Sequence, residues 1–177
     1  MSLTSTPTRY GAVAIAIHWT SAIAIVATFG LGLMAAGTTD PATEVTLVRG
    51  HIVLGSLVLV LTLLRIGWWI WGDRRPAPLR GQPPMQELAA KVVHYAIYAV
   101  ILLMASSGIM TVILSGAIPA LIAGTALPDF SKVVPRLAHG IMSKLLLALL
   151  AAHIAAALYH QFIRRDRPLG RMGLGPA

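Results

Sequence analysis

The chain has 177 residues, of which 56% are hydrophobic and only 11% are charged, and its mean hydropathy is +0.76. A soluble domain carries about 25% charged residues, so this composition lacks material for a water-facing surface and indicates a lipid environment. The sequence contains no cysteine, which excludes disulfides, thiolate metal sites, iron–sulfur clusters and covalent haem attachment. The net charge of +8 gathers at the ends of apolar segments. Membrane topology and anionic lipids explain that pattern better than nucleic acid does.

Four apolar segments are long enough to cross a membrane. They lie at about residues 11–36, 50–71, 88–114 and 135–163. The first is longer than the core of a cleavable signal peptide, which usually has about 7–15 residues, so we interpret it as a span. Residues 118–127 are apolar but too few to cross, and we expect a re-entrant or interfacial part of a loop there. The sequence predicts an all-α membrane protein with one four-helix up-down bundle and no soluble domain.

Basic residues predict that both termini lie in the cytoplasm, because loops rich in Lys and Arg stay on that side. Three basic residues would face the periplasm, namely Arg49, Lys132 and Arg136. Nine would face the cytoplasm: Arg9, Arg74, Arg75, Arg80, Lys91, Arg164, Arg165, Arg167 and Arg171.

The six histidines sort into two layers by depth. His51 and His139 open the second and fourth spans and lie toward the periplasm. His18, His94, His153 and His160 lie toward the cytoplasm. The fourteen residues from His139 to His153 rise about 21 Å and turn about 1400° in an α-helix, so the two side chains share nearly one face. Histidines in hydrocarbon are costly unless something binds them.

Two histidine layers in a cysteine-free bundle favour bis-histidine haem b, which slots between helices and takes one ligand from each side. Zinc is an alternative, but it usually requires three or four ligands, and the acidic residues lie in loops, at helix ends or in the tail. A proton relay would normally include an intramembrane carboxylate. Separate structural histidines remain a further alternative, although they fit depth-matched layers poorly.

Arg65 shares the face of His51, fourteen residues further along the second span. A cation at that depth needs a partner, and a propionate of a cytoplasmic haem would supply one. Snorkelling of Arg65 to the headgroups is the alternative, because the span ends a few residues later.

The chain resembles the bacterial cytochrome b561 family over nearly its whole length. The matching residues are IHW with His18, GH with His51 followed by Arg65, HYAIY from His94, AH at His139, and AAHIAAALYH with His153 and His160. The resemblance implies a diheme membrane cytochrome. It implies that His51 and His139 bind the periplasmic haem b, and that His18 and His153 bind the cytoplasmic one.

The same resemblance implies electron transfer across the inner membrane between a periplasmic one-electron donor and the quinone pool. Stand-alone members include a superoxide oxidase, which makes superoxide the first candidate donor and ubiquinone the expected acceptor. Related subunits anchor larger dehydrogenases or hydrogenases and accept their electrons, so a partner subunit is the alternative. The expected periplasmic face carries three acidic and three basic residues, so net charge alone does not predict steering of an anion.

A quinone is expected beside the cytoplasmic haem. The candidates for bonding its carbonyl oxygen or supplying protons are His160, Tyr159, Arg74 and Arg75. His160 is preferred, because it follows His153 on a similar face and lies two turns nearer water. His94 is either a rival ligand of the cytoplasmic haem or a further quinone contact. The sequence assigns no catalytic residue.

Overall fold

The computed structural model describes residues 2–78 and 81–175, so Arg80 lies outside the described part of the chain. Within it there is no strand, and four long helices have the length and composition to cross a membrane. They are α1 (Ala12–Gly37), α2 (Pro41–Gly67), α3 (Pro84–Leu114) and α5 (Val134–Leu158). A turn of π-helix extends α2 through Trp68–Gly72 and α5 through Tyr159–Arg164. The prediction of an all-α, four-helix membrane protein is confirmed.

Helices α2 and α3 begin before the apolar segments 50–71 and 88–114 from which they were predicted. Helix α2 begins at Pro41, where the Asp40 carboxylate accepts a hydrogen bond of 2.9 Å from the amide of Thr43. The Thr43 hydroxyl and amide hold the pKa of Asp40 below its ordinary value. Helix α3 likewise begins at Pro84, with Glu87 in its first turn. Because of these polar first turns, His51 and His94 lie nearly three turns inside their helices.

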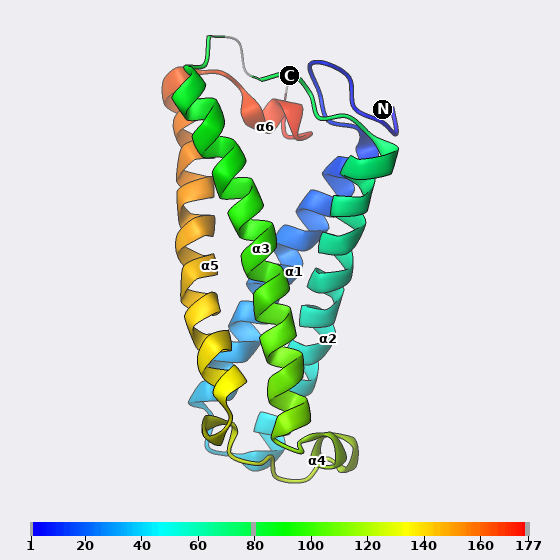
Figure 1. Cartoon of the computed structure of the whole chain (residues 1–177), viewed down its shortest axis with the longest axis vertical. Helices are drawn as coiled ribbons and strands as arrows, with labels where there is room; N and C mark the ends of the chain where they lie inside the picture. Colours follow the sequence, from blue (N-terminus) through cyan, green and yellow to red (C-terminus); the bar gives the residue numbers. More distant parts are fainter. Residues whose placement is uncertain (1, 79–80, 176–177) are drawn as a thin grey trace.

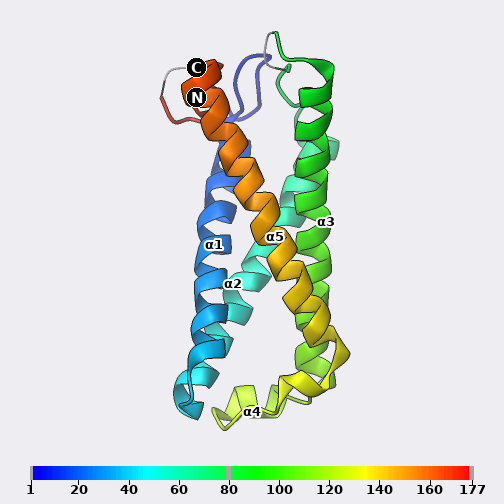
Figure 2. The same ribbon diagram turned by 90° about the vertical axis from the view of Figure 1, so that its left-hand side faces the viewer.

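The bundle consists of two antiparallel helix pairs, α1 with α2 and α3 with α5 (Figures 1 and 2). Contacts within each pair are far more extensive than those between pairs, which run mainly from α2 to α3. The short helix α4 (Ile118–Ala123), formed by the 118–127 stretch, lies at one end of the bundle. Both termini and α6 (Pro168–Arg171) lie at the other end. We call these the α4 end and the termini end.

An apolar layer crosses the middle of the bundle. Its buried members come from all four long helices: Ala24, Ile25, Val58, Val100, Ile101 and Leu146. Leu146 is completely buried, and it stands seven residues from both His139 and His153. This layer therefore separates the histidines near the α4 end from those near the termini end.

Hydrogen bonds tie three chain segments together at the termini end. Asp73, after α2, accepts bonds of 2.9 and 2.6 Å from the amide and hydroxyl of Ser5. The Arg171 guanidinium donates to the carbonyl oxygens of Thr8 and Ala77 at 3.0 and 2.6 Å. The indole N–H of Trp19 donates to the Met172 carbonyl at 2.9 Å. The N-terminal segment, the loop after α2 and helix α6 thus form one connected cap.

Candidate haem-binding site

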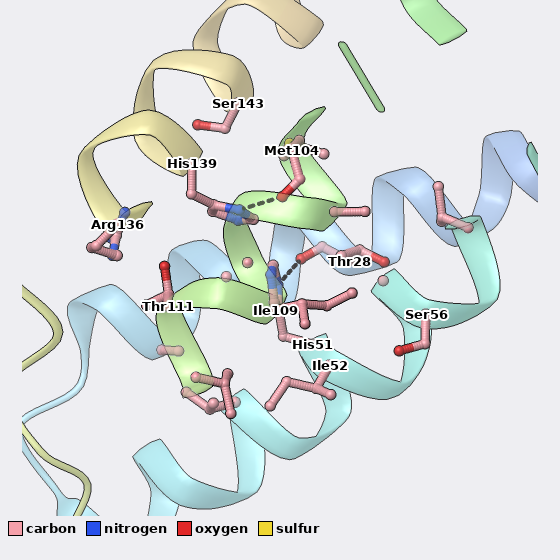
Figure 3. A pocket seen from close by; sticks show the side chains of 18 of the residues that line it. Thr28, His51, Ile52, Ser56, Met104, Ile109, Thr111, Arg136, His139 and Ser143 are labelled. Carbon is pink, nitrogen blue, oxygen red and sulfur yellow. Dashed lines mark hydrogen bonds between the residues drawn. The ribbon is translucent and has the colours of Figure 1, made fainter. Parts of the chain in front are cut away.

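Near the α4 end, His51 on α2 and His139 on α5 face each other across the space between the two helix pairs (Figure 3). Their ring centroids are 5.9 Å apart and their planes are inclined by 70°. Metal–imidazole bonds of about 2 Å place the centres of two axial rings roughly 6 Å apart. The separation of His51 and His139 therefore suits one metal ion between them.

The backbone of a neighbouring helix orients each of these rings. His51 donates from Nδ1 to the Thr28 carbonyl of α1 at 2.9 Å, and His139 donates from Nδ1 to the Met104 carbonyl of α3 at 2.9 Å (Figure 3). A proton on Nδ1 leaves the lone pair of a neutral imidazole on Nε2, where it can bind a metal. Both rings are thus held in the tautomer that ligation requires.

Two glycines make room for these rings. A Cβ atom at Gly32 of α1 would lie 3.0 Å from two ring atoms of His51, and one at Gly108 of α3 would lie 3.1 Å from a ring atom of His139. Sequence reasoning missed both glycines, although a signal was present. Gly32 follows His18 by fourteen residues, and Gly108 follows His94 by fourteen, the same interval that joins His51 to Arg65. All four long helices therefore share one two-layer register.

The two histidines line a cavity of about 580 Å³ whose walls are mostly apolar. Gly32, Gly55 and Gly108 contribute to these walls. Arg136 and Ser143 add polar groups (Figure 3), and Glu44 adds a carboxylate. Pockets for organic cofactors usually measure about 300–1,000 Å³ and combine apolar walls with a few polar groups. Opposed imidazoles with free Nε2 atoms, glycine walls and one cation for a propionate fit a haem b group here.

Near the termini end, one side chain from each long helix enters a second layer: His18, Arg65, His94 and His153. The ring centroids of His18 and His153 are 6.3 Å apart, whereas those of His94 and His153 are 5.1 Å apart. A metal between two imidazoles requires roughly 6 Å between ring centres. Ring separation therefore favours His18 over His94 as the partner of His153.

Hydrogen bonding in this layer favours the other histidine. Arg65 donates from Nη1 to Nδ1 of His18 at 3.0 Å, so a neutral His18 ring carries its proton on Nε2. His94 instead donates from Nδ1 to the carbonyl of Ala90 at 2.6 Å, which leaves its Nε2 free. Ligation by His18 through Nε2 thus requires Arg65 to release Nδ1.

Arg65 points into the bundle rather than toward the headgroups. Besides the bond from Nη1 to His18, its Nε atom is buried and has no hydrogen-bond partner among the described residues. A buried guanidinium nitrogen without an acceptor is costly. A haem propionate would satisfy this donor and would also draw Arg65 away from His18.

Single histidine substitutions separate the two arrangements. We expect His18→Ala to remove the low-spin haem of this layer, and His94→Ala to retain it, because ring separation is harder to adjust than the position of an arginine side chain. Haem content per chain and the low-spin electron paramagnetic resonance signals measure this. Loss of the haem in His94→Ala and retention in His18→Ala would reverse the assignment.

The remaining predicted site residues lie at the termini end in separate places. His160 contacts Asp166 and packs edge-on to Tyr159, which is half-exposed. Arg75 lies over the rings of Trp69 and Tyr95, 5.5 and 5.1 Å from their centroids, and so bridges the π-helical turn after α2 and the first half of α3. Arg74 is exposed. In residues 2–78 and 81–175, no hydrogen bond or ion pair joins either arginine to His160.

Four membrane-spanning helices whose facing surfaces present opposed imidazoles define the architecture of a membrane-embedded b-type cytochrome. A family model described as prokaryotic cytochrome b561 matches residues 9–175. The chain is also 31% identical, over 188 aligned positions, to cytochrome b561 homolog 2 of Escherichia coli (strain K12). That alignment covers 97% of this chain and 95% of the relative. The chain therefore belongs to the prokaryotic cytochrome b561 family, which makes it a multi-pass membrane electron-transfer protein and implies b-type haem.

Proposed function

We propose that the chain carries electrons across the inner membrane from a periplasmic one-electron donor, with superoxide as the first candidate, to ubiquinone through two haem b groups. The observation that carries this proposal is the pair of histidine layers on either side of the apolar layer around Leu146. The haems supply one-electron redox chemistry when bound. The protein sets their distance, because fourteen residues of helix rise about 21 Å.

His51 and His139 would hold the periplasmic haem, and His18 and His153 the cytoplasmic one. The orientation follows from the excess of basic residues at the termini end, which would face the cytoplasm. His51 and His139 would together hold this haem, which would supply one-electron chemistry to a donor that reaches the cavity lined by these residues. The residues that line the cavity would then bind the donor and bring it within reach of the cofactor.

The distribution of charge at the α4 end supports an anionic donor more than the net charge does. Lys132 lies 3.9 Å from Asp129, which offsets its charge. Arg136 lines both the large cavity and a smaller neighbouring one of about 290 Å³. Lys144 and Ser131 line the smaller cavity. Glu44 is the acidic residue among the described residues that line these two cavities, so the cations Arg136 and Lys144 outnumber it there and leave a positive balance that would attract an anion.

Superoxide-dependent quinone reduction tests the proposal. The purified protein would receive superoxide in the presence of a soluble ubiquinone, with quinol formation followed by absorbance. We expect reduction well above the uncatalysed rate and its loss when superoxide dismutase is added. A protein that shows no such activity, but co-purifies with a dehydrogenase and accepts its electrons, would favour the alternative of an anchor subunit.

His160 is the residue that we expect to contact the quinone. Replacing His160 with Ala should slow quinone reduction about tenfold or more, because an unsatisfied hydrogen bond to a buried ligand costs about 1–3 kcal/mol. Both haem spectra should stay intact, and Lys91→Ala, an exposed position at the same end, serves as the control. Unchanged turnover in His160→Ala would remove this residue from the quinone site.

A further inference from the structure

Asp166 folds back onto His160 at the end of the fourth span. The Nδ1 atom of His160 donates to Oδ2 of Asp166 at 2.6 Å, and the amide of Asp166 donates to the His160 carbonyl at 3.0 Å. Both side chains are largely shielded, with exposures of 15% and 18%. A short bond between an imidazole and a shielded carboxylate is a charge-assisted bond, which is stronger than a neutral one.

The backbone around Asp166 adopts a costly conformation to make this contact. Arg165 and Arg167, on either side of Asp166, have φ angles of 61° and 53°. These left-handed conformations are uncommon outside glycine, and such strain gathers at functional sites. His160 itself lies in the π-helical turn Tyr159–Arg164, and turns of this kind are also frequent at functional sites.

Contacts on the far side of Asp166 hold the turn closed. The amide of Leu169 donates to the side-chain oxygen of Gln161 at 3.3 Å. Helix α6 then leads to Met172, whose carbonyl accepts the indole N–H of Trp19. The strained turn is thus fixed both to the end of α5 and to α1, so the approach of Asp166 to His160 is maintained by three elements.

We propose that Asp166 is a positioning residue that holds His160 as the proton donor to the quinone. This inference rests on the proposed function. Reduction of one quinone to quinol consumes two electrons, supplied by the periplasmic donor, and two protons, taken from water at the termini end. A carboxylate that accepts the hydrogen bond from Nδ1 directs Nε2, the other ring nitrogen, away from itself. Its negative charge also stabilises the doubly protonated ring.

The proton step conserves atoms and charge. The Nε2–H bond of the imidazolium breaks and an O–H bond forms at the reduced carbonyl oxygen of the quinone. The ring becomes neutral, and its remaining proton stays on Nδ1, where it is hydrogen-bonded to Asp166. Nε2 then takes the next proton from water. Arg164 lies beside this pair, with its Nε atom 3.9 Å from Oδ2 of Asp166.

The substitution Asp166→Asn separates this role from a structural one. The asparagine side-chain oxygen can still accept the hydrogen bond from Nδ1 of His160, but the negative charge of the carboxylate is lost. The holoprotein would be reduced with dithionite and mixed with a soluble ubiquinone, with haem reoxidation followed by stopped flow. We expect Asp166→Asn to lower the maximal rate at least about tenfold with little change in the quinone concentration for half-maximal rate. Asp166→Glu should recover part of the rate. Glu87→Gln, which removes a partly exposed carboxylate at the same end, should match the wild type.

A double-mutant comparison and a spectroscopic signature complete the test. In a His160→Gln background, Asp166→Asn should cause no further loss, because its effect passes through His160. Nitrogen-15 spectra of the reduced, diamagnetic protein should show the His160 Nδ1 proton in the wild type and its displacement in Asp166→Asn. If Asp166→Asn slowed quinone reduction equally in the wild-type and His160→Gln backgrounds, or did not slow it at all, the role of Asp166 would be wrong and the proposed function would still stand. Failure of the wild-type protein to pass electrons to quinone would overturn the proposed function as well.

Discussion

His51→Ala is expected to reduce the haem content from about two groups per chain to about one. His51 and His139 come from different helix pairs and meet at a centroid separation of 5.9 Å. Few contacts join the two pairs elsewhere. With one ring lost, a haem in this layer would be held by a histidine from only one of the two helix pairs.

His139→Ala should give the same result as His51→Ala, since the two rings would serve one iron. Each variant would be purified and analysed by pyridine haemochrome assay, with protein quantified independently. His160→Ala is the matched control, because it removes a histidine from the same chain segment as His153, and the His160 ring contacts Asp166 rather than the rings of His18, His94 and His153. It should retain both haems. If His51→Ala and His139→Ala lost different haems, or neither lost one, the pairing of these two residues would be wrong.

Gly32→Val is expected to expel the haem of the same layer without touching a ligand. A Cβ at Gly32 would lie 3.0 Å from two atoms of the His51 ring, which is well inside the optimal contact distance of about 3.5–4.0 Å. The ring cannot move away from the added side chain without breaking the hydrogen bond from its Nδ1 to the Thr28 carbonyl, which measures 2.9 Å. The methyl groups of valine add to the conflict.

Gly30→Val provides a matched control for this experiment. Gly30 lies on the same helix, two residues away, and a Cβ there would meet nothing within 4 Å. Both variants therefore place the same residue type in α1, and only one of them faces a histidine. We expect one low-spin haem in Gly32→Val and two in Gly30→Val by haemochrome assay and low-temperature spectra. Two undisturbed haems in Gly32→Val would mean that the His51 ring is free to move.

Much of the fold was accessible from the sequence, because hydrocarbon imposes long apolar runs that a hydropathy reading detects. The four helices follow from those runs, and their up-down order follows because successive spans of a membrane alternate in direction. The beginnings of α2 and α3 were less accessible. Pro41 and Pro84 begin helices through capping and helix-compatible backbone angles, in polar turns that lie before the apolar segments.

The two layers of histidines were also predictable, since the fourteen-residue interval fixes both face and depth on a helix. The structure brings His51 to His139 and gathers His18, His94 and His153. His160, which its depth also assigned to the cytoplasmic layer, lies apart from these rings and contacts Asp166. Which rings form pairs depends on the lateral arrangement of the helices. No periodicity within one helix carries that information.

The groups that orient the histidines were the least accessible part of the site. The carbonyls of Thr28 and Met104 act through the backbone, so their residue types give no signal. The contact of Asp166 with His160 has no signal in the sequence, because a turn with positive φ at two arginines is contrary to local preference. Such a turn forms when tertiary contacts outweigh that preference, here through the ties of α6 to α1 and α5.

The most direct test of two-haem electron transfer is the haem count of the purified wild-type chain. A pyridine haemochrome assay with quantified protein, together with a reduced-minus-oxidised spectrum, would measure it. We expect about two b-type haems per chain, both low-spin and bis-histidine. A single haem, or none in protein expressed with ample haem supply, would contradict the assignment of one haem to each histidine layer.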